Sequence, residues 1–132
     1  MNNNIPVYEP YMIGNEKKYV NQCLDSNWIS SKGEFINKFE KKFASYIKVE
    51  HATTVSNGTV ALHLALMSLS IRDGDEVILP TLSYVASANS VKYVGAKPIF
   101  VDSEKDSWNI DTKKIEARIT SKTKAIMAVH LY

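Results

Sequence analysis

The stretch GDEVILPT, residues 74–81, decides the fold of this chain. It begins in a turn signal of Gly and Asp, continues as the uninterrupted apolar run of residues 77–79, and ends at Pro80. A strand with one face in water alternates apolar and polar residues, whereas a parallel strand covered on both faces reads as a continuous apolar run. The stretch therefore predicts a buried strand in a mainly parallel sheet.

Segments of the same kind lie on both sides of this strand. We expect four strands and, between them, three helices; the strands are residues 52–56, 76–79, 98–101 and 124–130, and the helices are about residues 59–70, 83–94 and 111–118. Strands that alternate with helices favour the right-handed β-α-β unit. The sequence thus predicts the α/β class, with a doubly wound, mainly parallel sheet.

The first fifty residues have the period of helices rather than of strands. Apolar residues form one helical stripe over residues 19–24 and a longer one after Glu34. The polar loop between them, residues 27–33, carries two large apolar side chains, so it either packs on something or binds something. We expect a helical segment over residues 1–50, followed by the sheet domain over residues 51–132.

Composition and charge exclude several classes of protein. The 132 residues are 45% apolar and 23% charged with a net charge of +2, and because the basic residues are dispersed we expect no nucleic-acid partner. The longest apolar stretch, residues 60–69, is shorter than the roughly 20 residues that span a bilayer, so no membrane partner is expected. Cys23 is single and no signal-peptide pattern is present, which makes the cytoplasm the default location. We expect no metal site, since His51, His63 and His130 share no metal-ligand spacing.

The sharpest motif for chemistry is TTVSNGTVAL, residues 53–62, which predicts a strand, a tight polar turn and a helix. Gly58 permits close backbone approach, Asn57 tolerates a left-handed turn conformation, and Thr59 offers a side-chain cap. The first N–H groups of the helix lie at the positive end of its dipole, where a phosphate group binds well. From the spacing alone, an anion site and an ordinary capped turn both remain open.

A second candidate follows the strand of residues 76–79. Tyr84 is expected at the start of the next helix, at the carboxyl edge of the sheet, where α/β folds bind their ligands. Its ring is suited to stacking on a flat heteroaromatic ligand. An ordinary core or surface tyrosine is the alternative interpretation.

Five segments together resemble one known family. They span most of the chain and are residues 27–35, 52–66, 74–81, 98–102 and 123–132. Through them the chain resembles the N-terminal part of the DegT/DnrJ/EryC1/StrS sugar aminotransferases, which are fold-type-I pyridoxal-phosphate enzymes. The resemblance implies that residues 51–132 form the first half of a pyridoxal-phosphate-binding large domain, and that the enzyme is a homodimer.

The resemblance also implies roles for single residues. Asn57, Gly58 and Thr59 would hold the phosphate of pyridoxal 5′-phosphate on backbone N–H groups and the Thr59 hydroxyl. Tyr84 would stack on the pyridine ring of this cofactor.

The resemblance further implies the reaction, which is amino transfer from L-glutamate to the 4-keto carbon of GDP-4-dehydro-6-deoxy-D-mannose. Trp28 and Ser30 would lie near this nucleotide sugar. The chemistry needs a lysine that bonds to the cofactor and a carboxylate that keeps the pyridine nitrogen protonated. In the family both lie beyond the matched segment, so no catalytic residue is expected in this chain. Asp102 matches a strand-end aspartate of the family and is expected to brace its loop.

Several points stay open at the level of sequence. Ser70 stands where many relatives carry Gly, which leaves the ending of the preceding helix uncertain. Residues 60–69 are apolar nearly all round, so that helix must be covered on its outer face as well. The alternatives are another nucleotide-sugar aminotransferase, a dehydratase of the same fold, or a non-catalytic α/β fragment that binds a phosphorylated ligand.

Overall fold

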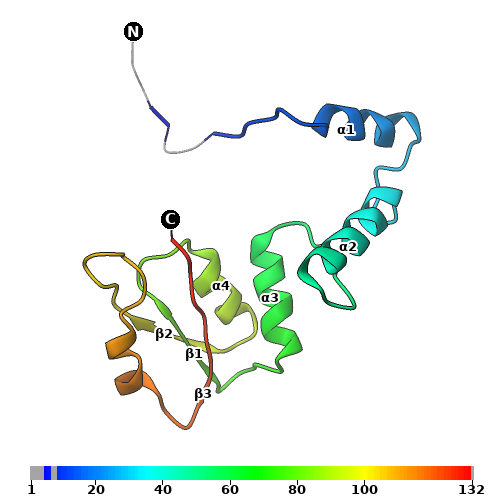
Figure 1. Ribbon diagram of the computed structural model, residues 1–132. Helices are drawn as coiled ribbons and strands as arrows, with labels where there is room; N and C mark the ends of the chain where they lie inside the picture. The colour runs from blue at the N-terminus through cyan, green and yellow to red at the C-terminus, as the bar shows by residue number, and fades with distance from the viewer. Residues whose placement is uncertain (1–4, 7–8, 132) are drawn as a thin grey trace. The chain divides into compact units, whose positions relative to one another are not determined.

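The computed structural model describes residues 5–6 and 9–131 (Figure 1). The chain divides into two compact units, residues 1–54 and residues 55–132.

The N-terminal unit holds two helices, α1 over Glu16–Asp25 and α2 over Glu34–Ile47. Both form where the apolar stripes predict them. Aromatic rings line these stripes: the centroids of Tyr19 and Phe35 lie 5.1 Å apart, and Phe39 stacks on Phe43 at 5.5 Å.

The second unit alternates helices with strands, as the sequence predicts. In chain order its elements are α3 (Gly58–Ser68), β1 (Glu76–Pro80), α4 (Ala86–Tyr93), β2 (Lys97–Val101), the short 3-10 helices η1 (Thr112–Lys114) and η2 (Glu116–Arg118), and β3 (Thr123–Ile126). The α/β class with a parallel sheet is confirmed.

β1 is the middle strand of an all-parallel sheet with the order β2-β1-β3. Ile78 of β1 lies opposite Ile99 on one side and Ile126 on the other. The side chains of Val77, Ile78 and Leu79 are almost wholly buried, at 0, 0 and 1% exposure. The continuous apolar run is therefore the signature of a central strand with both faces covered.

The core lies where α3 and α4 end. The N–H of Ile71 donates to the carbonyl of Leu66 at 3.1 Å, and the N–H of Ala96 donates to the carbonyl of Val91 at 3.2 Å. Each is the six-residue hydrogen bond of a Schellman cap, which brings two apolar residues together at the end of a helix. Both pairs are buried in one cluster with Val77 of β1.

The two caps differ in the residue that turns the chain. Gly95 has a φ of 79° and Ser70 has a φ of 59°, so both occupy the left-handed region. A Cβ at Gly95 would meet atoms of Asp73 at 3.3–3.4 Å, and Gly is the residue that fits there. At Ser70 the same conformation is held by a residue with a Cβ, which costs about 1–2 kcal/mol.

α3 and α4 both begin at the carboxyl edge of the sheet. α3, with 11 residues, and β1, with five, are both about 16 Å long. Because the chain leaves the C-terminus of α3 to begin β1 at the amino end of this strand, the N-terminus of α3 must lie near the carboxyl end of β1. Figure 1 shows the two helices side by side, starting at the edge where β1 ends. The turn before α3 and the loop before α4 therefore share this edge.

The predicted strand at residues 52–56 is wrong. Within the described residues the sheet has three strands, and residues 52–55 are irregular. The Thr54 N–H, which a ladder would use, instead donates to Oε1 of Glu40 at 2.8 Å, and its hydroxyl donates to the same oxygen at 2.9 Å. A strand needs a backbone neighbour, and here a side chain takes its place.

Three further boundaries differ from prediction for local reasons. The helix predicted to start at residue 83 starts at Ala86, because Thr81 N–H still donates to the Val101 carbonyl beyond the strand. The helix predicted over residues 111–118 is two 3-10 turns, with hydrogen bonds between residues three apart. The last strand ends at Ile126 rather than residue 130: Ile126 is the last residue paired with β1, opposite Ile78, whose carbonyl still accepts from the Met127 N–H at 2.8 Å.

The left-handed Ser70 makes a prediction about stability. Ser70→Gly is expected to raise the unfolding free energy by about 1 kcal/mol, because Gly adopts this conformation without steric cost. Urea unfolding measures the change. Ser68→Gly, two residues earlier at the last position of α3, is the matched control and should lower stability by about 0.5 kcal/mol. A Ser70→Gly variant that is less stable than the native chain would contradict the prediction.

Candidate functional site

The turn before α3 is built around the side chain and carbonyl of Asn57. Its Oδ1 accepts from the N–H of Val60 at 3.0 Å, and its carbonyl accepts from the N–H of Ala61 at 3.1 Å. Asn57 therefore caps the helix, as Asx residues at this position do. Its φ is −167°, so the backbone is extended and does not use the left-handed conformation that asparagine tolerates.

The next two N–H groups remain available at the start of α3. Within the part of the chain that the structure describes, no acceptor bonds the N–H of Gly58 or of Thr59, or the Thr59 hydroxyl. A Cβ at Gly58 would meet nothing within 4 Å, so there is open space in front of these donors. Unpaired donors at the positive end of a helix dipole, beside open space, fit a phosphate group.

Tyr84 lies in the loop between β1 and α4, two residues before the helix begins. Its side chain is 78% exposed. Its carbonyl is held by hydrogen bonds from Ser87 N–H at 3.1 Å and from the Ser83 hydroxyl at 3.3 Å. The ring is thus open to a ligand at the same edge of the sheet as the turn before α3.

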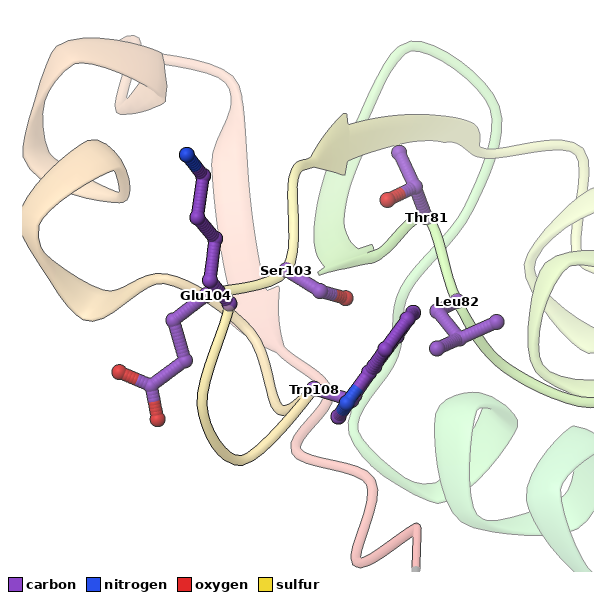
Figure 2. A pocket seen from close by; sticks show the side chains of 6 residues that line it. Thr81, Leu82, Ser103, Glu104 and Trp108 are labelled. Atoms are coloured by element: carbon purple, nitrogen blue, oxygen red, sulfur yellow. The ribbon is translucent and has the colours of Figure 1, made fainter.

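A cavity of about 460 Å³ lies at the carboxyl ends of β1 and β2. Its lining residues are Thr81, Leu82, Ser103, Glu104, Lys105 and Trp108. In Figure 2 the indole of Trp108 faces Leu82 and the Ser103 hydroxyl points toward it, whereas the Glu104 carboxylate points away. Sequence reasoning missed this cavity; the only signal was an aromatic residue soon after a strand end.

The loop that carries Trp108 is braced at both ends. The Asp102 carbonyl accepts from Asp111 N–H at 2.8 Å, and Lys114 Nζ lies 3.5 Å from a carboxylate oxygen of each of these aspartates. Trp108 itself has a φ of 61°, a conformation that bulky residues seldom adopt. The expectation that Asp102 braces its loop is confirmed.

Trp28 and Ser30 belong to the N-terminal unit. The Trp28 side chain is exposed and lines a cavity of about 630 Å³ together with Lys32 and other polar residues. Ser30 is exposed, and its hydroxyl accepts from Lys32 N–H at 3.4 Å. A role for either residue in substrate binding remains a prediction.

Among residues 5–6 and 9–131, no three His, Cys, Asp or Glu side chains are grouped so that they could hold a metal ion. No helix in the same residues has both the length and the apolar character needed to cross a membrane.

Hydrogen bonds from Thr54 lower the pKa of the Glu40 carboxyl group. Its pKa lies below the usual range, first because the backbone N–H of Thr54 donates to the carboxylate and second because the Thr54 hydroxyl does. Hydrogen bonds to the charged form favour ionisation. The carboxylate thereby ties α2 to residue 54, near the end of the N-terminal unit.

Comparison with known proteins identifies relatives of the whole chain. The sequence pattern of the DegT/DnrJ/EryC1/StrS aminotransferase family matches residues 10–132. The chain is 65% identical over 128 residues to GDP-perosamine synthase of Escherichia coli O157:H7. The aligned residues cover 97% of this chain and 35% of that protein. The chain thus spans about a third of the length of such curated relatives.

Two solved structures show the same fold. The aminotransferase from Psychrobacter cryohalolentis superimposes with a TM-score of 0.84 at 38% identity, covering 92% of this chain and 31% of that one. The E. coli GDP-4-keto-6-deoxy-D-mannose-3-dehydratase with bound hydrated PLP gives a TM-score of 0.83 at 29% identity, covering 97% and 34%.

The contacts of Glu40 predict how its carboxyl group titrates. The ionised Glu40 carboxylate stabilises the folded state at pH values above the ordinary carboxyl pKa. This stabilisation is lost as the pH falls through the lowered pKa of the folded state. Thr54→Val should raise this pKa only part of the way, because the stronger contributor, the backbone N–H, remains. Carbon-detected NMR titration of the Glu40 carboxyl group measures it. The neighbouring Thr53→Val should leave the titration unchanged, and an equal shift in both variants would contradict the assignment.

Proposed function

We propose, because the chain belongs to the DegT/DnrJ/EryC1/StrS aminotransferase family, that it forms the N-terminal part of a pyridoxal-phosphate-dependent nucleotide-sugar aminotransferase. The observation that carries this proposal is the 65% identity to a GDP-perosamine synthase along almost the entire chain. The proposed substrates are GDP-4-dehydro-6-deoxy-D-mannose and L-glutamate. The amino group of glutamate replaces the 4-keto oxygen of the sugar to give GDP-perosamine, and glutamate leaves as its 2-oxo acid.

Pyridoxal 5′-phosphate, when bound, supplies the electron sink on which amino transfer depends. The residues of this chain would bind and orient it. The N–H groups of Gly58 and Thr59 and the Thr59 hydroxyl would donate to the phosphate, with Asn57 holding the turn in place. Each hydrogen bond to the phosphate dianion is worth about 1.5–3 kcal/mol. Tyr84 would cover one face of the ring.

The remaining chemistry requires residues outside this segment. A lysine must bond to the cofactor and move the proton, and a carboxylate must pair with the ring nitrogen. We place both in the part of the enzyme that this chain does not cover, since it spans 35% of the matching synthase. The segment thus provides the phosphate and ring contacts, and none of its fourteen lysines is assigned the covalent role.

The active enzyme is proposed to be a homodimer. Supporting this, α3 leaves large apolar side chains in water on its outer side: Val60, Leu64 and Met67 are 40, 45 and 56% exposed. Apolar patches of this kind mark surfaces that another chain or segment covers.

A dehydratase of the same fold is the second candidate, because a GDP-4-keto-6-deoxy-D-mannose-3-dehydratase superimposes on 97% of the chain. Both candidates use the same cofactor contacts, so these contacts do not distinguish them. The two reactions are distinguished by their products, because the aminotransferase adds nitrogen at the 4-position of the sugar, whereas the 3-dehydratase removes the hydroxyl group at the 3-position.

The substrate assignment predicts the outcome of a parallel assay. The complete enzyme, supplied with L-glutamate and pyridoxal phosphate, is expected to aminate GDP-4-dehydro-6-deoxy-D-mannose and to leave the matching dTDP-linked keto sugar unreacted. Mass spectrometry of the sugar product measures the exchange of oxygen for NH. Amination of the dTDP sugar alone would overturn the GDP assignment. Loss of a hydroxyl without gain of nitrogen would identify the dehydratase instead.

The open space at Gly58 predicts a separation of stability from binding. Gly58→Ala should leave unfolding within about 1 kcal/mol of the native value, because the added methyl meets no protein atom. In the complete enzyme the methyl group would occupy the space of the phosphate, and the dissociation constant for pyridoxal phosphate should rise about tenfold or more. Fluorescence titration measures it. Ser68→Ala at the opposite end of α3 is the control, and equal affinity in all three proteins would refute the phosphate contact.

A further inference from the structure

The loop that carries Tyr84 is held by a chain of serine hydroxyls. Ser83 and Ser87 lie with their Oγ atoms 2.8 Å apart, and the Ser83 hydroxyl also donates to the Tyr84 carbonyl at 3.3 Å. The Ser87 N–H donates to that same carbonyl at 3.1 Å. One backbone carbonyl thus receives two hydrogen bonds from the residues on either side of it.

The direction of the hydroxyl chain follows from counting protons. A serine hydroxyl has one proton to donate and two lone pairs to accept with. Since Ser83 donates to the Tyr84 carbonyl, Ser87 must donate to Ser83. Ser87 therefore acts on Tyr84 twice, directly through its N–H and indirectly through Ser83. Its side chain is 5% exposed, so water does not compete for this hydroxyl.

The result is an exposed ring on a fixed backbone. A tyrosine that is 78% exposed gains little from packing, so its ring provides no apolar anchor for the loop. The hydrogen bonds supply that anchor and leave the flat face of the ring uncovered. A group fixed in place before its ligand arrives loses less conformational entropy on binding.

We infer that Ser83 and Ser87 are positioning residues that hold Tyr84 ready to stack on a flat ring at the carboxyl edge of the sheet. The inference rests on the proposed function for the identity of that ring, the pyridine of pyridoxal phosphate. It requires no contact between either serine and the cofactor.

Ser90 provides a matched control within the same helix. Its hydroxyl is fully buried and donates to the Ser87 carbonyl at 2.9 Å, but it does not contact Tyr84. Ser90→Ala therefore removes a buried hydroxyl of α4 that bonds the Ser87 backbone, while the hydrogen bonds of the Ser83 and Ser87 hydroxyls stay in place. Ser83→Thr keeps the hydroxyl at a half-buried position and serves as the conservative variant.

The first measurement uses the 132-residue chain without cofactor. With 3-fluorotyrosine placed at position 84, fluorine NMR relaxation reports how far the ring and its loop are ordered. Ser83→Ala and Ser87→Ala are expected to increase the mobility at Tyr84 severalfold, with Ser83→Thr restoring it and Ser90→Ala leaving it at the native value. Equal mobility in Ser83→Ala and the native chain, or the same increase in Ser90→Ala, would overturn the inference.

The second measurement tests the cofactor in the complete enzyme. Ser83→Ala removes the hydrogen bonds that the Ser83 hydroxyl makes with the Tyr84 carbonyl and with Ser87, so it should weaken pyridoxal phosphate binding about fivefold, and Ser83→Thr should recover it. If the enzyme with native serines binds no pyridoxal phosphate, the proposed function fails while the fluorine experiment still decides the positioning role. If binding is normal and Ser83→Ala does not weaken it, the positioning role fails alone.

Discussion

The sheet unit depends on the burial of β1, a strand of five residues. Val77, Ile78 and Leu79 are removed from water almost entirely, and each buried side chain of this size contributes about 1.5–3 kcal/mol. The strand can be buried on both faces only if it has a neighbour on each side and helices above it. β2 and β3 provide the neighbours, and the ends of α3 and α4 meet Val77.

This packing places the apolar core at one end of the unit and the ligand edge at the other. The two Schellman caps bring their buried pairs, Leu66 with Ile71 and Val91 with Ala96, to the amino end of β1. Because both helices run back along the sheet, their N-termini then lie at its carboxyl end. Positive dipole ends, uncapped N–H groups and loop side chains gather there.

The carboxyl edge is built mainly from polar groups that bind one another. Asn57 caps α3, Asp102 and Asp111 hold Lys114 beside the Trp108 loop, and serine hydroxyls fix the backbone at Tyr84. Such contacts fix backbones in place and leave the aromatic side chains exposed. An edge made this way suits a ligand that has both a phosphate and a flat ring, which agrees with the family to which the chain belongs.

Local signals in the sequence were sufficient for the parts of the structure that neighbouring residues determine. The apolar run of residues 77–79 predicted the central strand, the stripe after Glu34 predicted α2, and the turn at residues 57–59 predicted the start of α3. The sequence did not reveal that residues 52–56 would lack a strand, because a strand exists only where a second backbone pairs with it. At Thr54 the partner is the Glu40 side chain, fourteen residues away.

The candidate site divides in the same way. By itself the sequence predicted the turn at residues 57–59, which we propose as a phosphate site, and an aromatic residue after β1, since both follow from residue types within a few positions of one another. Only the tertiary structure decided that the two share one edge, that a cavity lined by Trp108 opens at the carboxyl ends of β1 and β2, and that Ser83 and Ser87 hold the Tyr84 loop. These depend on the parallel order of the strands and on hydrogen bonds whose geometry no sequence spacing specifies.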